Sequence, residues 1–322
     1  MSASDGAAIT ATGLTKRFGR LTAVDRLDLA VPAGCVYGFL GPNGAGKTTT
    51  VRMLATLSRP DAGTARVLGY DLARQADAVR ERISLTGQFA ALDADLTGRE
   101  NLRLVARLRG YRSKAARARA DRLLAAFELT DAADRPVKTY SGGMLRRLDI
   151  AAALTVRPEL LFLDEPTTGL DPASRNSVWH AVRTLASGGT TVLLTTQYLH
   201  EADQLAGRIA VIDHGRLIAE GTPDELKSAV GGGSLRVRLA DSTQRDSAAQ
   251  LLARRLGHPA SAPSAGQHPD TITIAAREPV GAAAAVTALA DAGIAVAGFA
   301  HDRPSLDEVF LALTGGAAES KP

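Results

Sequence analysis

The chain has 322 residues, of which 45% are hydrophobic and 22% charged, with a net charge of +4 and an isoelectric point of about 9.4. This size and composition are typical of a soluble globular protein with one large and one smaller domain. No apolar run reaches the roughly 18–20 residues that span a bilayer, and the first residues lack the basic start and apolar core of a secretory signal. The single cysteine, Cys35, excludes an intrachain disulfide framework and favours a reducing cytoplasm.

Positive charge is concentrated between Arg103 and Arg122, in a stretch with helix-like apolar spacing. One interpretation is a solvated helix face in an Arg- and Ala-rich composition. The other is contact with a membrane or with the cytoplasmic loops of a membrane protein. Aromatic residues make up only 4% of the chain and are not interleaved with this run. Because single-stranded nucleic acid is bound by stacking bases on aromatic rings, we expect no nucleic-acid partner.

Apolar runs bounded by turn residues predict a mixed α/β core in the first 230 residues. Strands are expected at 9–14, 27–31, 36–40, 160–163 and 191–194. Helices are expected at 47–57 and within 98–156, which places a helical subdomain at about 89–156. A hairpin is expected from 209–213 and 216–218, with its turn at His214 and Gly215.

The triplet Gly231-Gly232-Gly233 predicts a flexible joint. It separates a first domain, residues 1–230, from a C-terminal domain, residues 231–322. Strands of the second domain are expected at 235–239, 271–275 and 294–299, and helices at 247–256, 280–292 and 306–313. This alternation predicts a small α+β domain.

The strand at 36–40 runs directly into a loop that matches the phosphate-binding pattern G-x-x-x-x-G-K-[ST] in full. The loop consists of Gly41, Pro42, Asn43, Gly44, Ala45, Gly46, Lys47 and Thr48, followed by Thr49. Its glycines let backbone N–H groups turn inward around phosphate oxygens, and the next helix points its positive end at them. Lys47 is expected to reach the β- and γ-phosphates, and the Thr48 hydroxyl to bind Mg²⁺. The sequence therefore predicts a nucleotide site with Mg²⁺.

An acidic pair, Asp164 and Glu165, ends the apolar strand at 160–163. Asp164 can hold the Mg²⁺ shell, directly or through water. A carboxylate at Glu165 can orient or deprotonate an attacking water, so we expect it to be the general base.

Five motifs follow one another in a fixed order. They are the phosphate loop, Gln88, Ser141-Gly142-Gly143, Asp164-Glu165 and Gly169-Leu170-Asp171-Pro172. This order resembles the nucleotide-binding subunit of ATP-binding cassette (ABC) transporters over roughly residues 7–228. The resemblance implies a P-loop NTPase of the ABC type, with a mixed core sheet, an antiparallel β subdomain and a helical subdomain, and it implies ATP as the nucleotide.

The resemblance also implies roles for individual residues. Ser141-Gly142-Gly143 would open a helix whose N-terminus faces the γ-phosphate held by a second copy, so that a homodimer sandwiches two ATP molecules. Gln88 would contact Mg²⁺ or the attacking water and sense a membrane partner. Asp171 would lie in the loop that joins the two sites. Phe18 would stack on adenine, and an ordinary core position at a strand end is the alternative.

Two residues depart from the family pattern. Met144 stands where most members have glutamine, which removes one polar side chain but leaves the backbone donors. Gln197 aligns with the family's switch histidine. An amide can still donate to a phosphate oxygen, but it does not titrate. His200, three residues later, is expected to lie on a helix surface. Glu165 is therefore the better candidate for the base.

Gln197 with Tyr198 and Leu199, and the ending at 303–315, narrow the resemblance to ATPase subunits of daunorubicin/doxorubicin-type drug exporters. These imply a peripheral ATPase on the cytoplasmic face of the cell membrane, which powers export of a drug or other hydrophobic compound through a separate integral membrane permease. Export of lipid or polysaccharide is the alternative. A soluble ABC ATPase is disfavoured, because the chain has one cassette and no coiled-coil insert. A regulator that has lost hydrolysis is favoured by Gln197 and disfavoured by the intact Lys47 and Glu165.

Overall fold

The computed structural model describes residues 6–86, 92–230, 233–260, 268, 270–276, 278–302 and 305–314. The described residues form two compact units, which divide between Pro223 and Asp224. The sequence places the boundary at Gly231–Gly233, and Gly231 and Gly232 lie outside the described residues. The boundary between residues 230 and 231 therefore stays a prediction.

The first unit is built on a six-stranded sheet in the order β10-β9-β3-β8-β7-β6. These strands are β3 (Val36–Leu40), β6 (Ile83–Thr86), β7 (Leu160–Asp164), β8 (Thr191–Thr196), β9 (Arg208–Asp213) and β10 (Arg216–Gly221). All neighbours are parallel except the hairpin pair β9 and β10. β3, β7 and β8 are buried along their whole length, because both faces of the sheet are covered.

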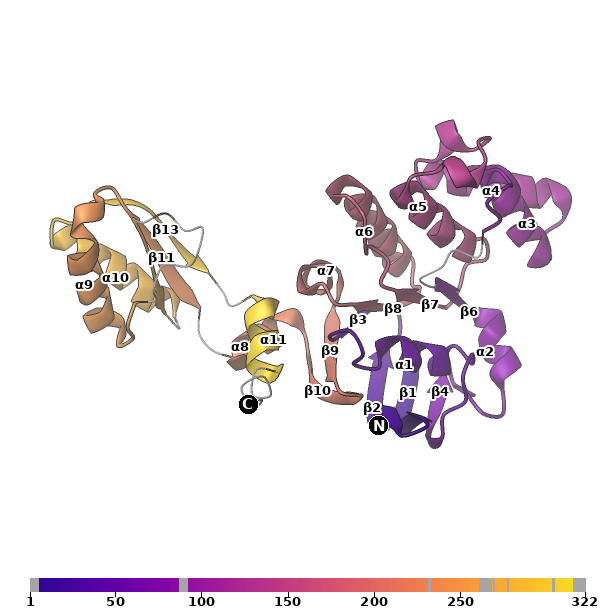
Figure 1. The fold of residues 1–322 in the computed structure, drawn as a ribbon, viewed down its shortest axis with the longest axis horizontal. Coiled ribbons are helices and arrows are strands. Elements are labelled where there is room, and N and C mark those ends of the chain that lie inside the picture. Colours follow the sequence, from indigo (N-terminus) through magenta and orange to yellow (C-terminus); the bar gives the residue numbers. More distant parts are fainter. Residues whose placement is uncertain are drawn as a thin grey trace. The chain divides into compact units, whose positions relative to one another are not determined.

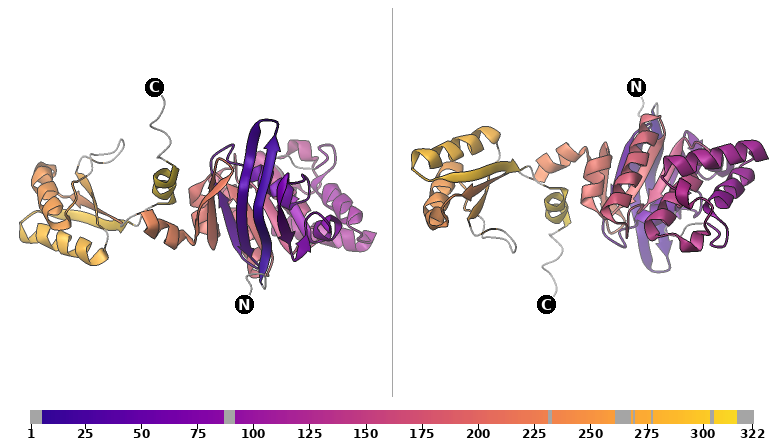
Figure 2. Two further views of the ribbon diagram at one scale, coloured as in Figure 1. Left: turned by 90° about the horizontal axis from the view of Figure 1, so that it is seen from below. Right: turned by 90° about the horizontal axis from the view of Figure 1, so that it is seen from above.

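A second, antiparallel sheet has the order β2-β1-β4-β5. Its strands are β1 (Ala7–Phe18), β2 (Leu21–Pro32), β4 (Ala62–Val67) and β5 (Tyr70–Asp71). β1 and β2 are longer than the sequence predicts, because the pairing continues past an irregularity between Ala11 and Leu14. There the Gly13 N–H donates to Asp28 Oδ1 at 2.7 Å. Figure 2 shows these two long strands in indigo.

Helices cover both faces of the six-stranded sheet (Figure 1). The helices of this unit are α1 (Lys47–Leu54), α2 (Ala76–Arg82), α3 (Gly98–Leu108), α4 (Ser113–Ala126), α5 (Gly142–Ala153), α6 (Pro172–Ser187) and α7 (Leu199–Leu205). α1 and the antiparallel sheet pack on one face, and α5 and α6 on the other. α3 and α4 pack against each other. The mixed core sheet, antiparallel β subdomain and helical subdomain expected from the sequence are thus present.

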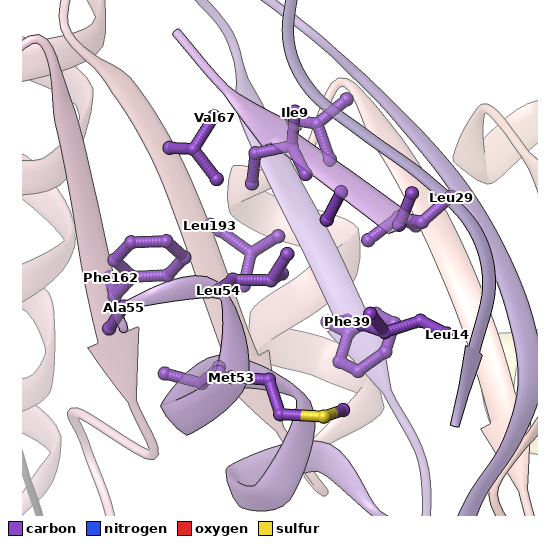
Figure 3. Close-up of a cluster of buried hydrophobic side chains, with 14 of the residues drawn as sticks. Ile9, Leu14, Leu29, Phe39, Met53, Leu54, Ala55, Val67, Phe162 and Leu193 are labelled. Atoms are coloured by element: carbon purple, nitrogen blue, oxygen red, sulfur yellow. The ribbon is translucent and has the colours of Figure 1, made fainter. Parts of the chain in front are cut away.

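The hydrophobic core between the two sheets surrounds α1 (Figure 3). Met53 and Leu54 of α1 contact side chains from both sheets, including Phe39, Phe162 and Leu193 of the parallel strands. Burial of such side chains stabilises the fold by about 1.5–3 kcal/mol each. The packing fixes the start of α1, and with it the phosphate loop, at the carboxyl end of β3.

The second unit has its own core around a three-stranded antiparallel sheet in the order β12-β11-β13. Its elements are α8 (Pro223–Val230), β11 (Ser234–Leu239), a 3₁₀ turn (Ser242–Gln244), α9 (Arg245–Leu256), β12 (Thr271–Ala275), α10 (Pro279–Asp291), β13 (Val296–Asp302) and α11 (Leu306–Thr314). α9 and α10 supply buried residues to this core. The order of elements from β11 to α11 is the one predicted, whereas α8 was not expected.

The basic run lies on α3 and α4. Most of its side chains are exposed, namely Arg103, Arg107, Arg109, Arg112, Lys114, Arg117 and Arg122. Arg119 is partly buried and donates to the carbonyls of Leu154 at 2.6 Å and Thr155 at 3.0 Å. The arrangement fits a solvated helix face, and contact with a membrane protein stays a prediction.

Candidate functional site

The phosphate loop connects the end of β3 to α1, and two of its glycines are required by close backbone contacts. A Cβ at Gly41 would lie 2.3 Å from the Ile212 carbonyl oxygen, and one at Gly46 would lie 2.4 Å from that of Ala23. Gly46 also has φ +100°, which disfavours any other residue. The first turn of α1 contains no acidic residue, and no side chain caps it. Its N–H groups and dipole are therefore available to an anion.

Lys47 lies across this loop, almost fully buried. Its Nζ donates to the carbonyls of Gly41 at 2.7 Å and Pro42 at 3.0 Å, and lies 3.6 Å from Glu165 Oε1. Burial lowers the pKa of Lys47, and the Glu165 and Asp164 carboxylates partly oppose that shift. An ammonium group among two carbonyls and one carboxylate is a suitable donor for phosphate oxygens.

Asp164 ends β7 beside the phosphate loop. The Thr48 hydroxyl donates to Asp164 Oδ1 at 3.3 Å, and the Thr195 hydroxyl also donates to that oxygen. The described ranges contain no group of three His, Cys, Asp or Glu residues placed to hold a metal ion. Mg²⁺ is usually held by one or two protein oxygens with phosphate oxygens and water, so Mg²⁺ at Thr48 and Asp164 stays a prediction. Gln88, the third expected ligand, lies outside the described residues.

Glu165 follows Asp164 in a left-handed backbone conformation, with φ +47°. Its N–H donates to both the carbonyl and the hydroxyl oxygen of Thr195, each at 3.1 Å. The side chain turns back to Lys47, and its Oε2 accepts from the Thr168 hydroxyl at 3.3 Å. The backbone bonds to β8 therefore hold Glu165 in place independently of the contacts of its carboxylate.

Ser141 caps the N-terminus of α5, and its hydroxyl accepts from the Met144 N–H at 3.3 Å. A Cβ at Gly143 would lie 2.4 Å from Ser174 Oγ, so the glycine lets α5 approach the start of α6. Asp171 caps α6, where its carboxylate accepts from the Ser174 N–H and hydroxyl. These bonds, the hydroxyl first, lower the pKa of Asp171.

The structure brings Lys47, Thr48, Asp164 and Glu165 together, but not Ser141 and Gly142. Those two residues are exposed. Among the described residues, the hydrogen bonds and ion pairs of the phosphate loop reach Asp164 and Glu165, and none reaches Ser141–Gly143. That the glycine pair acts on a nucleotide held by another copy stays a prediction.

Three further residues lie where the sequence placed them. Gln197 follows β8 and is partly exposed. His200 is exposed on α7, with its ring 5.5 Å from that of Trp179. Phe18 ends β1 with 54% of its surface exposed, which argues against the core alternative and leaves its ring accessible for stacking.

Arg146 is a site residue that the sequence motifs did not indicate. From α5 it donates to the carbonyls of Asp164 at 2.8 Å and Pro166 at 3.0 Å, and it lies 3.1 Å from Asp149 Oδ2. It therefore joins the helix that starts with the glycine pair to the turn that carries Glu165. Its only sequence signal is an arginine one turn into an otherwise largely apolar helix.

Asp149 should make the stability of the fold depend on pH. Burial raises its pKa from 3.8 to about 6, and Arg146 only partly opposes this. The folded state thus binds more protons than the unfolded state between these values. The stabilising contribution is complete below about pH 4 and is lost as the pH rises through 6, and it amounts to about 3 kcal/mol. Between pH 4 and 7, wild type should lose this much free energy of unfolding relative to Asp149→Asn. Urea unfolding at several pH values measures this difference, and parallel curves for the two proteins would contradict it.

The phosphate loop, the Asp164–Glu165 pair and the parallel sheet define a P-loop ATPase. The ABC transporter family model matches residues 24–168, and the model of the ATP-binding protein DrrA1-3-like C-terminal domain matches residues 221–314. No helix in the described ranges has the length and apolar character needed to cross a bilayer.

Two curated relatives match over nearly the whole chain. A daunorubicin/doxorubicin resistance ATP-binding protein of Streptomyces peucetius is 57% identical over 98% of this chain and 94% of the relative. A doxorubicin resistance ATP-binding protein of Mycobacterium tuberculosis is 45% identical over 98% and 96%. The fold also matches a dimeric ATP-binding cassette bound to ADP and Pi, with a TM-score of 0.62 and 24% identity over 66% of this chain and 98% of that chain. The chain belongs to the DrrA-type ATP-binding proteins of the ABC transporter family, and it is an ABC-type ATPase.

Proposed function

We propose that this chain is the energy-supplying subunit of a drug exporter. The observation that carries the proposal is its 57% identity, over nearly the full length, to a daunorubicin/doxorubicin resistance ATP-binding protein. The match includes the C-terminal unit, which has its own DrrA-like family model. Under this proposal the cassette covers residues 1–230. The domain from 231 to 322 would serve subunit assembly or regulation.

The residues of the site have different roles in ATP hydrolysis. Lys47 and the backbone N–H groups of residues 41–49, apart from Pro42, hold the phosphates, and Phe18 stacks on adenine. Thr48, Asp164 and Gln88 would hold Mg²⁺, which neutralises phosphate charge when bound. Glu165 accepts a proton from the water that attacks the γ-phosphorus, and Gln197 donates to a γ-phosphate oxygen. The bond to the β–γ bridging oxygen breaks, giving ADP and phosphate.

A homodimer would complete each site. Ser141 and Gly142 lie exposed at the start of α5, and Ser141–Gly143 has no described bond to its own phosphate loop. Placed against the γ-phosphate of a second copy, this helix terminus would supply N–H donors to an anion. Asp171 would lie in the loop between the two sites. The solved dimeric cassette with ADP and Pi is a precedent within the same fold.

The cargo would cross the membrane through a separate integral permease, with this chain bound at the cytoplasmic face. A suitable experiment co-expresses the chain with a permease encoded in the neighbouring reading frame. Cells with both proteins should accumulate less daunorubicin than cells in which Lys47 is replaced by alanine, and the two proteins should co-purify. Unchanged drug accumulation despite co-purification and active ATP hydrolysis would contradict the drug assignment and favour lipid or polysaccharide export.

A further inference from the structure

Glu201 is a buried carboxylate that has no role in the site described so far. It lies in the first turn of α7, with only 1% of its surface exposed. Burial raises its pKa, while hydrogen-bond donors around it favour the charged form. An apolar side chain of similar size would fill this position at a lower desolvation cost. The carboxylate therefore needs an explanation other than packing.

Two donors converge on one oxygen of Glu201. The Thr167 hydroxyl donates to Oε1 at 2.9 Å, and Trp179 Nε1–H donates to the same atom at 3.2 Å. The other oxygen, Oε2, has no hydrogen-bond partner of good geometry in the described part of the chain. The Thr196 hydroxyl nevertheless interacts with the carboxylate and favours its charge. Because Thr167 and Trp179 donate to the same oxygen, this carboxyl group links two segments of the chain.

The partners of Glu201 come from three segments that surround the nucleotide site. Thr167 lies two residues after Glu165, in the turn that follows β7. Thr196 is the last residue of β8 and immediately precedes Gln197. Trp179 belongs to α6, the helix that Asp171 caps. One carboxylate thus connects the segments that carry Glu165, Gln197 and Asp171.

We propose that Glu201 is a positioning residue for ATP hydrolysis. It fixes the position of the turn after Glu165 relative to the segment that contains Gln197. The side chains of Glu165 and Gln197 can then both reach the same γ-phosphate. The inference rests on the roles proposed above for Glu165 and Gln197. It does not involve nucleotide binding by the phosphate loop, because no described contact of Glu201 reaches residues 41–49.

The first test removes one hydrogen-bond donor to Glu201 and leaves the shape of the donating side chain unchanged. Thr167→Val deletes the hydroxyl that reaches Glu201 at 2.9 Å. We expect kcat to fall about 10-fold or more, because small misplacements of reacting groups have effects of this size. The dissociation constant for ATP should change little. Thr167→Ser restores a hydroxyl and should recover most of the activity.

Thr190→Val is the matched control. Thr190 is equally buried, and its hydroxyl donates to the Pro158 carbonyl at 3.1 Å, before β7 begins. If the effect of Thr167→Val were only lost stability, Thr190→Val would reduce kcat equally. The proposal expects wild-type kcat for Thr190→Val, even if its melting temperature falls.

Trp179 supplies a spectroscopic test, because it is the only tryptophan of the chain. Its indole N–H is bound to Glu201, so its emission reports on this centre. Saturation with ATP and Mg²⁺ should change the emission of wild type and of Thr190→Val, and the change should be reduced in Thr167→Val. All spectra are recorded in one buffer, because the ring of His200 lies 5.5 Å from that of Trp179. Glu201→Gln should behave as Thr167→Val does, and Thr167→Val alone decides the test if the glutamine variant does not fold.

The outcomes separate this inference from the proposed function. Normal kcat and a normal emission change in Thr167→Val would overturn the positioning role of Glu201. If the role proposed for Glu165 were wrong, Glu165→Gln would instead hydrolyse ATP at the wild-type rate, whatever Thr167→Val does. Loss of kcat in Thr167→Val that Thr167→Ser restores supports the inference.

Discussion

Replacing Glu165 with glutamine is expected to reduce kcat for ATP hydrolysis by roughly 100- to 10,000-fold, the range of general-base catalysis. The amide keeps the size of the side chain but cannot accept the proton of the attacking water. The fold should remain intact, because the Glu165 N–H is held by Thr195 through backbone and hydroxyl oxygens. ATP should still bind, since Lys47 and the phosphate loop are unchanged. ATP that is bound but not hydrolysed should hold two copies together.

Steady-state hydrolysis and gel filtration with ATP measure the two effects of Glu165→Gln. Glu159→Gln is a matched control at the other end of the same strand, where Glu159 is exposed and pairs with Arg82. The control should retain the wild-type rate and elution volume. A Glu165→Gln variant that remains monomeric at saturating ATP would contradict the sandwiched homodimer. A Glu165→Gln variant that hydrolyses ATP at the wild-type rate would contradict the role of Glu165 as the general base.

Replacing Lys47 with alanine is expected to lower kcat/KM by at least about 100-fold, as does the loss of other groups that stabilise transition-state charge. Lys47 places a buried ammonium group within the phosphate loop, where its three donors can exchange Gly41, Pro42 and Glu165 for phosphate oxygens. Alanine cannot replace that charge, so ATP affinity should fall as well. This distinguishes Lys47→Ala from Glu165→Gln, which should bind ATP normally.

Titration with a fluorescent ATP analogue and a steady-state assay would check the prediction for Lys47→Ala. Lys138→Ala is the control, because Lys138 is exposed and pairs with Asp95 at 2.9 Å. Wild type that is no faster than Lys47→Ala would identify a nucleotide-binding regulator without hydrolysis. Wild-type activity in Lys47→Ala would show that the phosphate loop takes no part in the reaction.

The elements of the fold that are marked by a local pattern of adjacent residues can be predicted from the sequence. Unbroken apolar runs mark β3, β7 and β8, since strands covered on both faces need no polar alternation. For β1 and β2, the sequence predicts shorter strands than the structure contains. Gly13 and Asp28 look like turn residues, and only the pairing of the two strands turns them into an irregularity within a longer ladder. β4, β5 and α2 are short, and no clear apolar period marks them.

The phosphate loop, the Asp164–Glu165 pair and the helix start at Ser141 can be predicted from the sequence alone, because each is a local pattern whose chemistry depends on adjacent residues. The distant groups that support them become visible in the folded protein. Arg146 reaches carbonyls 18 and 20 residues away, and Glu201 receives donors 22 and 34 residues away. Such bonds arise where packed segments bury a charge that must then be satisfied. That requirement depends on burial, and burial exists only once the sheets and helices have come together.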